Sequence, residues 1–216
     1  MLYIVNRGFI NGQNRKKTKN NKALNEYGIS TASNSKRLLA YALDWAIGGI
    51  VTGLPAVFMY SIVTSRSDMF SNLYVFEALG YDKTYGIIAG FLCLMTAILY
   101  FIVIPLKKYL GQTLGKKIAK IKILTWSDEN VSIKTLAVRY AITFIFESPL
   151  FIISTYIMQT LTLITRFYVE SVWTFVGIAC TLISAAMVIY TKKHCAIHDY
   201  VAKTKVVEVR ADETTN

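Results

Sequence analysis

Acidic residues, histidines and cysteines are all scarce in this chain. Its 216 residues include 13 acidic side chains against 24 basic ones, two histidines and three cysteines. His194 and His198 both follow the last long apolar segment, so Ser148 in the third segment has no histidine base nearby, and no set of nucleophile, base and orienting residue appears. We therefore expect no enzymatic activity.

Apolar sequence is what the chain has in abundance. It is 54% hydrophobic with a mean hydropathy of +0.41, whereas soluble domains are about 45–50% apolar. Four segments, at about residues 38–64, 85–106, 136–165 and 172–191, are long enough to cross roughly 30 Å of hydrocarbon at about 1.5 Å per helical residue. We predict an all-α membrane protein, built as a four-helix transmembrane bundle.

The net charge of +11 is distributed by loop. Basic residues gather in the N-terminal arm, in the loop between the second and third segments and in the C-terminal tail. The other two loops carry Arg66 and Lys83 in one and Arg166 in the other. The positive-inside rule then puts both termini and the central loop in the cytoplasm, and the protein in the cell membrane. The basic loops are expected to meet the lipid bilayer and its anionic headgroups rather than nucleic acid.

Composition divides the chain into three regions. Residues 1–35 form a polar cytoplasmic arm rich in Asn and Lys, which we predict to be disordered and which lacks the apolar run of a signal peptide. Residues 36–208 form the membrane domain, and residues 209–216 form a tail. Because Cys93 and Cys180 lie in apolar segments and Cys195 lies on the cytoplasmic side, we expect no disulfide.

Two similar segments follow the second and fourth apolar stretches. IAKIKIL (Ile118 to Leu124) and VAKTKVV (Val201 to Val207) both alternate apolar and basic residues. An alternation with a period of two is typical of a half-buried strand. We predict that the two segments pair as a two-stranded ribbon beneath the bundle.

Two apolar segments begin with an arginine and bury an acid farther in. Arg37 precedes Asp44 by seven residues, and Arg139 precedes Glu147 by eight, which places each acid roughly 10–12 Å inward from an arginine at the membrane surface. An ionised acid in hydrocarbon costs a few kcal/mol, so these four residues form a candidate charged intramembrane site. With the two similar strand segments, the spacing also suggests a duplicated two-helix unit.

Two interpretations of the acids stay open. Asp44 and Glu147 can be protonatable cation ligands, as exchange of a proton for a cation requires. Alternatively, Asp44 is a static partner of Arg37 or Arg139, with Arg139 the easier geometry because it lies on a neighbouring helix. Glu147 in that case is protonated and bonds to a carbonyl freed by a kink at Pro149.

Glycines are placed for helix packing. Gly49 and Gly53 lie in the first segment, and Gly86 and Gly90 in the second. Small residues four apart let helix backbones approach closely, so we expect the first two helices to pack tightly through them. Pro55 is expected to kink the first helix.

Three motifs together resemble the RDD family of bacterial multi-pass membrane proteins. They are RLLAYALD in the first segment, GQTLGKKIAKIKIL after the second and IHDYVAKTKVV after the fourth, and they span about residues 36–208. The resemblance implies a multi-helix integral membrane protein, with a link to ion transport, including sodium/proton exchange, for some members and accessory or self-protection roles for others. Family members often have Gly where this chain has Lys203. The resemblance makes Arg37, Asp44 and Asp199 the name-giving residues, and the other motif positions are Gly111, Gln112, Gly115, Lys116 and His198.

The motifs also allow two other interpretations. GQTLGK partly resembles a phosphate-binding loop but lacks its spacing and a preceding strand, so we expect a tight turn. His194 and His198 are one turn apart if helical, which together with Cys195 and Asp199 allows a zinc hypothesis. Because the family pattern already accounts for His198 and Asp199, neither a metal nor another cofactor is expected. Asp199 is expected to cap a helix or to pair with the basic loop GKK.

Two functions follow from these observations. The leading hypothesis is a non-enzymatic membrane protein that moves, or helps to move, a small cation or solute, with Asp44 as the central acid, Glu147 as a second acid and Arg37 and Arg139 as partner bases. Since four helices are few for a transport path, we expect a homodimer. The alternative is an accessory or immunity-type protein that binds a membrane-protein partner or protects against a toxin, with its charges static.

Overall fold

The computed structural model describes residues 30–68, 71–149, 151–191 and 193–209. The predicted disorder of the N-terminal arm falls mostly on residues 1–29, and the predicted tail mostly on residues 210–216, and both of these ranges lie outside the described residues. The described part is mostly helical, as predicted. In chain order the elements are α2 (Asn34–Thr64), α3 (Val75–Ala78), α4 (Lys83–Ile98), η1 (Leu99–Val103), α5 (Ile104–Lys107), α6 (Leu114–Ile118), β1 (Ile121–Thr125), α7 (Ile133–Ile142), η2 (Thr143–Glu147), α8 (Ile152–Thr165), α9 (Glu170–Tyr190), α10 (Ile197–Val201) and β2 (Thr204–Glu208).

Three helical stretches are long and apolar enough to cross a membrane: α2, α4 continued through η1 and α5, and α9. Polar side chains start two of them, because the first N–H groups of a helix need acceptors. Ser33 accepts the N–H of Lys36 before α2, and Asp82 accepts the N–H of Thr84 before α4. Helix α2 continues unbroken through Pro55.

The third apolar segment is broken near Pro149, where a kink was expected, so residues 136–165 do not form one continuous helix. α7 and its π-helical end η2 stop at Glu147, α8 starts at Ile152, and the two halves are bent by 76°. Pro149 has no N–H for a helix and disfavours helical geometry at the residue before it. Ser148 accordingly leaves the helix, with φ −137° and ψ 63°. Within the described residues, three helices are thus long and apolar enough to cross a membrane, or four if the bent pair is one span.

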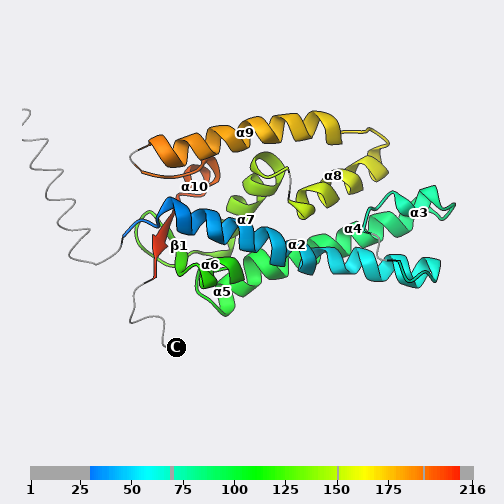
Figure 1. The fold of residues 1–216 in the computed structure, drawn as a ribbon, viewed down its shortest axis with the longest axis horizontal. Coiled ribbons are helices and arrows are strands. Elements are labelled where there is room, and N and C mark those ends of the chain that lie inside the picture. Colours follow the sequence, from blue (N-terminus) through cyan, green and yellow to red (C-terminus); the bar gives the residue numbers. More distant parts are fainter. Residues whose placement is uncertain (1–29, 69–70, 150, 192, 210–216) are drawn as a thin grey trace, which may run out of the picture.

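The helices form an elongated bundle (Figure 1). α2 and α4 pack side by side along one flank, α9 forms the other flank, and α7 and α8 lie between them. α5, α6, α10 and the strands gather at one end, while α3 and the α8–α9 turn lie at the opposite end. The end that carries the strands is called the ribbon end below.

The predicted two-stranded ribbon is confirmed. β1 and β2 are antiparallel, with Ile121 opposite Glu208 and Thr125 opposite Thr204. Each strand buries its first, third and fourth residues, so burial alternates over the first three residues and the alternation ends at the fourth, which is also buried. Because the strands come from the two halves of the chain, the ribbon ties those halves together.

The glycine steps contact a helix that the sequence did not suggest. A Cβ on Gly49 would lie 2.8 Å from Ile152, and one on Gly90 would lie 2.0 Å from the Thr160 hydroxyl. Both neighbours belong to α8. α2 and α4 do pack together, but the glycine steps let both of them approach α8, so the expected glycine contact between the first two helices is wrong.

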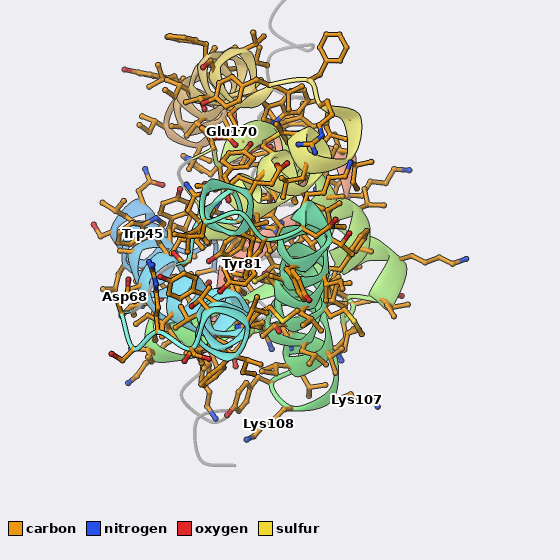
Figure 2. All side chains as sticks on the ribbon, turned by 90° about the vertical axis from the view of Figure 1, so that its right-hand side faces the viewer. Trp45, Asp68, Tyr81, Lys107, Lys108 and Glu170 are labelled. Carbon is orange, nitrogen blue, oxygen red and sulfur yellow. The ribbon has the colours of Figure 1, made fainter. Side chains whose placement is uncertain are left out.

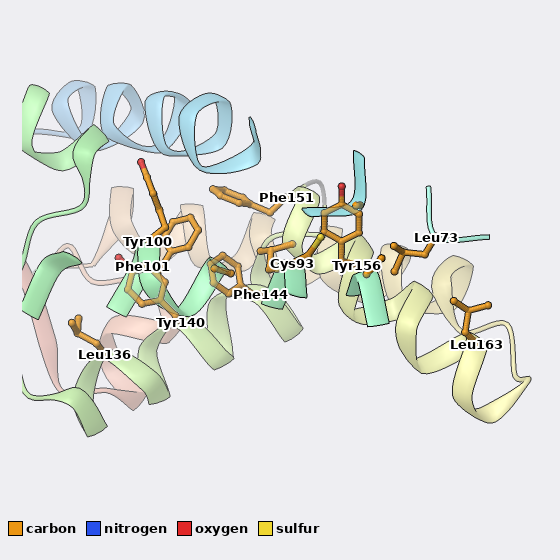
Figure 3. Packing of buried hydrophobic residues seen from close by; sticks show 14 of the residues in the cluster. Leu73, Cys93, Tyr100, Phe101, Leu136, Tyr140, Phe144, Phe151, Tyr156 and Leu163 are labelled. Carbon is orange, nitrogen blue, oxygen red and sulfur yellow. The ribbon is translucent and has the colours of Figure 1, made fainter. Parts of the chain in front are cut away.

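Aromatic residues fill the core near the ribbon end (Figure 3). The ring of Phe101 lies 5.2 Å from Tyr140, 4.9 Å from Phe144 and 6.0 Å from Phe151, measured between centroids. Edge-to-face and tilted contacts of this kind are favourable for aromatic rings. Large apolar side chains also cover the outside, where Figure 2 shows Trp45 on the outer side of α2. Such an exterior is expected where helices face lipid.

Candidate functional site

A cavity of about 400 Å³ opens between α2, η2 and α9 near the ribbon end. All four residues of the predicted intramembrane site line it: Arg37 and Asp44 from α2, Arg139 from α7 and Glu147 from η2. Three residues of the family motifs, Lys116, His198 and Asp199, line it as well. The fold thus brings charges from distant parts of the sequence to one space.

Asp44 is 2% exposed and accepts hydrogen bonds from four donors. The Tyr100 hydroxyl lies 3.1 Å away and the Thr113 hydroxyl 2.5 Å away. The Gly115 N–H lies 3.0 Å away and the Lys116 ammonium 2.9 Å away. This donor set stabilises an ionised carboxylate.

The salt-bridge partner of Asp44 is therefore Lys116, and the expected pairing with Arg37 or Arg139 is wrong. Lys116 belongs to the short helix α6, which packs against α2. Burial by itself would lower the pKa of Lys116, but the adjacent Asp44 carboxylate outweighs it and raises the pKa above its usual value. Lys116 is thus held in its charged form.

Glu147 is also surrounded by donors. Its carboxylate accepts the His198 N–H at 2.6 Å, His198 Nδ1 at 2.7 Å and the Ser184 hydroxyl at 2.6 Å. The proposed bond from a protonated Glu147 to a freed carbonyl is wrong. A freed carbonyl does exist, since the backbone oxygen of Glu147 accepts the Thr181 hydroxyl.

The proton of His198 is placed by its two neighbours. Its Nε2 lies 2.9 Å from Arg139 Nη2, and a guanidinium can only donate. Nε2 must therefore accept, which leaves the proton on Nδ1, facing Glu147. His198 is neutral in this arrangement and links Arg139 to Glu147.

Asp199 is 1% exposed and pairs with Arg139. It also accepts the Ala196 N–H at 3.1 Å and the Thr204 hydroxyl at 3.1 Å. Burial would raise the pKa of Asp199, but the charges of Arg139 and Arg37 outweigh it and lower the pKa to about 2. Asp199 does cap its own helix, α10, but it pairs with Arg139 rather than with the GKK loop.

Arg37 joins α2 to the ribbon. Its Nε donates to the Ala32 carbonyl at 3.3 Å, and its Nη2 donates to the Val206 carbonyl at 3.2 Å. Its Nη1 lies 3.8 Å from Asp199. The two arginines of the predicted site therefore share one carboxylate, which neither was expected to contact.

The two halves of the chain share one local arrangement, in which an N-cap residue, a short helix, a residue with positive φ and a strand follow one another. In the first, Thr113 precedes α6, Lys120 follows with φ 56°, and β1 begins. In the second, Ala196 precedes α10, Lys203 follows with φ 52°, and β2 begins. The shared geometry supports the duplicated unit suggested by the sequence. It also explains why glycine suits position 203, because a positive φ favours glycine.

The remaining motif residues hold the turn before α6. Gly111 has φ 89°, and a Cβ there would lie 2.4 Å from the Ile123 carbonyl oxygen. Gln112 donates to the Ile121 carbonyl at 2.9 Å. A Cβ on Gly115 would lie 2.7 Å from the Asp44 carboxylate. The GQT part of the GQTLGK stretch is therefore the expected tight turn and LGK begins α6, and the two glycines let this region approach β1 and Asp44.

Nothing in the geometry supports the zinc hypothesis. In the described part of the chain, no three His, Cys, Asp or Glu side chains lie close enough to hold a metal ion. His194 Nδ1 instead lies 2.8 Å from the Val188 carbonyl.

Sequence reasoning missed several polar residues of the site, among them Tyr100, Thr113 and Ser184. Tyr100 and Ser184 lie within apolar stretches, where a single hydroxyl gives little signal. Thr113 did carry a signal, because a threonine before a short basic helix is a common N-cap. Its side chain accepts the N–H of Lys116 as well as donating to Asp44.

Comparison with known proteins agrees with the motifs. A family model for the RDD family matches residues 31–203, most of the chain and nearly all of the described residues. Searches of curated proteins and of solved structures gave no match. The chain therefore belongs to the RDD family, whose members are membrane proteins.

Proposed function

We propose that the protein moves, or helps to move, a small cation or solute across the cell membrane without enzymatic chemistry. The observation that supports this most is the convergence of Arg37, Asp44, Arg139 and Glu147 on one cavity of about 400 Å³. Cavities of about 300–1,000 Å³ are the usual size for small-molecule sites. Charged residues at membrane depth are costly, and they mark substrate or ion pathways when they line a cavity.

The location of the cavity supports the same proposal. Its lining comes from both halves of the chain, Asp44 and Lys116 from the first and Glu147 and His198 from the second. Transporters built from internal repeats bind their substrates where the repeats meet. The duplicated construction of this chain puts the cavity at such a junction.

The hydrogen bonds of Asp44 and Glu147 favour a solute over a cation as the transported species. A cation that bound Asp44 would have to displace the Lys116 ammonium and compete with three further donors. A cation at Glu147 would likewise displace His198 and Ser184. We therefore propose that these charged side chains keep fixed positions in the lining of the cavity and do not bind a cation.

The orientation is part of the proposal. Lys107 ends α5 at the ribbon end (Figure 1) and Lys108 follows it, and Figure 2 shows both at the lower edge of the molecule. We place this end in the cytoplasm, with both termini on that side, by the positive-inside rule. Anionic headgroups are then the natural contacts of these lysines.

A second candidate is an accessory or immunity-type protein that binds a membrane partner. The complete pairing of Asp44, Glu147 and Asp199 favours it, because static charges need no change of protonation. α9 offers a surface for such a partner or for a second copy in a homodimer, since 11% of its most apolar window is buried.

Cation-driven proton exchange in everted membrane vesicles tests the first proposal. Sodium, lithium and potassium are added to vesicles that contain the wild type, Asp44→Asn or Glu77→Gln, at equal amounts of folded protein. Glu77 is the matched control, since its carboxylate pairs with Arg166 in an exposed salt bridge far from the cavity. Exchange that is lost in Asp44→Asn but kept in Glu77→Gln supports cation transport. Absence of exchange in well-folded wild type rules out these three ions and leaves the solute to be identified.

A further inference from the structure

We infer that the cavity takes an amphiphile with one uncharged, hydrogen-bonding head, which enters sideways from the bilayer between α2 and α9. This inference rests on the proposed function and names the class of solute. Four observations carry it: the position of the opening, the apolar walls, the charge balance of the lining and one incompletely hydrogen-bonded hydroxyl.

The opening lies between two helices that do not pack against each other. Within the described residues, α2 contacts α4, α6 and α8, whereas α9 contacts α8, η2 and α10. Figure 1 shows α9 apart from α2, on the other flank of the bundle. The rims of the cavity are Leu38 and Tyr41 on α2 and Ala185 and Ile189 on α9, which are all exposed. In a membrane these rims face lipid, so a molecule dissolved in the bilayer reaches the cavity directly.

The walls suit an apolar body. Phe101, Phe144, Phe151 and Val188 line the cavity together with the rim residues. Burial of apolar surface among such side chains is favourable by about 25 cal/mol per Å² relative to water. A hydrophilic solute gains nothing from these walls, whereas an alkyl or ring system does.

The charges of the lining cancel. Arg37, Lys116 and Arg139 are balanced by Asp44, Glu147 and Asp199, and His198 is neutral between Arg139 and Glu147. Each ionised side chain already has a partner of opposite charge or a donor at hydrogen-bond distance. A charged head would have to break one of these pairs in a space of low dielectric. An uncharged head breaks none.

One hydroxyl on the wall is incompletely hydrogen-bonded. The Tyr140 hydroxyl is buried beside the Lys116 ammonium, which already donates to Asp44, and it makes no hydrogen bond of good geometry with the described atoms. Tyr140 lines the cavity, and a buried hydroxyl without a good hydrogen bond is unfavourable. A hydroxyl, carbonyl or amide on the incoming molecule satisfies it, which orients the head inward and the apolar body toward the opening.

Photolabelling in nanodiscs tests the inference. Three probes share one diazirine-bearing alkyl chain and differ in the head: a hydroxyl, a trimethylammonium or a sulfonate. Labelled peptides are identified by mass spectrometry. We expect the alcohol to label residues of the cavity wall several-fold more than either charged probe does.

Two matched pairs of variants sharpen the test. Ala185→Trp closes the rim, whereas Ile183→Trp places a tryptophan on the opposite face of α9, so only the first should abolish cavity labelling. Tyr140→Phe should weaken alcohol labelling about fivefold, the effect of one neutral hydrogen bond. Tyr156→Phe should leave it unchanged, because the Tyr156 hydroxyl is also buried without a hydrogen bond of good geometry but lies outside the cavity lining.

The outcomes separate this inference from the proposed function. Equal cavity labelling in Ala185→Trp and Ile183→Trp overturns the inference, as does stronger labelling by a charged probe. Transport activity without cavity labelling overturns the inference while the proposed function stands. Cavity labelling by the alcohol in a protein that moves nothing leaves the ligand class standing and overturns the transport proposal.

Discussion

Asp44 and Glu147 hold equivalent places in the two halves of the chain. Asp44 accepts the N–H of Gly115 at 3.0 Å, and Glu147 accepts the N–H of His198 at 2.6 Å. Gly115 and His198 are both the second residue of a five-residue helix that leads into a strand of the ribbon. Each half therefore anchors its short helix to a membrane helix through a carboxylate.

The pair of Asp44 with Lys116 is expected to be structural. Asp44→Asn leaves a buried ammonium without a charge partner, which costs about 3–5 kcal/mol. Thermal unfolding in detergent, followed by a thiol-reactive dye as buried Cys93 and Cys195 become accessible, measures the loss. Asp44→Asn/Lys116→Met should recover part of the stability, because it removes both charges.

The control for that series is Asp128→Asn. Asp128 pairs with Lys205 at 2.7 Å in an exposed position, so its loss should cost less than about 1 kcal/mol. If Asp44→Asn is as stable as Asp128→Asn, Asp44 is not a static partner, and a titrating role becomes the better explanation.

Gly115 should tolerate no side chain. A Cβ there would lie 2.6 Å from the Ala40 carbonyl oxygen and 2.7 Å from Asp44. Gly115→Ala must push α6 away from α2 and weaken the bonds to Asp44, so we expect a loss of at least about 2 kcal/mol. Gly80→Ala is the comparison, since a Cβ at Gly80 has nothing within 4 Å and meets only the strain of φ 83°. A smaller effect at Gly115 than at Gly80 would contradict the close approach of α6.

Stability should fall steeply in acid because of Asp199. Its pKa is about 2 in the folded protein against an ordinary value of 3.8. A lowered folded pKa contributes stability that is complete above 3.8 and is lost as the pH falls through about 2. At about 1.36 kcal/mol per pKa unit, the contribution is roughly 2 kcal/mol. Unfolding measured from pH 6 down to pH 2 should show this loss in the wild type and a flatter curve in Asp199→Asn. Identical curves would mean that Asp199 is not the group responsible.

Lys203→Gly is expected to stabilise the protein. The positive φ of 52° at Lys203 is unfavourable for a residue with a Cβ. Glycine has greater conformational freedom in the unfolded chain, which offsets part of this effect. We therefore expect the free energy of unfolding to rise by roughly 0.5–1 kcal/mol. Lys120→Gly, at the equivalent turn of the first half with φ 56°, should behave alike. A gain at one position and a loss at the other in thermal unfolding would argue against the equivalence of the two turns.

Substitution of Gly90 is expected to disturb the packing of α4 against α8. A Cβ at Gly90 would lie 2.0 Å from the Thr160 hydroxyl oxygen and 3.3 Å from Thr160 Cβ. Gly90→Ala should therefore destabilise the protein by about 1–3 kcal/mol. Gly90→Ala/Thr160→Ala removes the clashing oxygen and should restore much of that loss in the same unfolding assay. If Thr160→Ala does not restore stability, the clash at position 90 does not involve the Thr160 hydroxyl.

Local pattern alone determined much of this protein. The lengths of the apolar runs predicted α2, α4 and α9, because crossing hydrocarbon demands about 20 apolar residues whatever the neighbours are. The alternation in residues 118–124 and 201–207 predicted β1 and β2, because the side chains of a strand must alternate between two faces. The arginines and acids of the site were also identified in this way, since charges inside apolar runs are rare.

Tertiary structure alone decided which of these groups meet. Asp44 pairs with Lys116, 72 positions away, and Arg139 with Asp199, 60 positions away, and no local period encodes such distances. The break at Ser148 likewise depends on packing, because a proline in a membrane helix can produce either a kink or a complete turn. The glycine steps offered close approach to any helix, and the bend after Glu147 brought α8 to both of them. A local sequence pattern shows that a buried charge requires a partner or that a helix allows close approach. The three-dimensional arrangement of the helices determines which residue or helix takes that place.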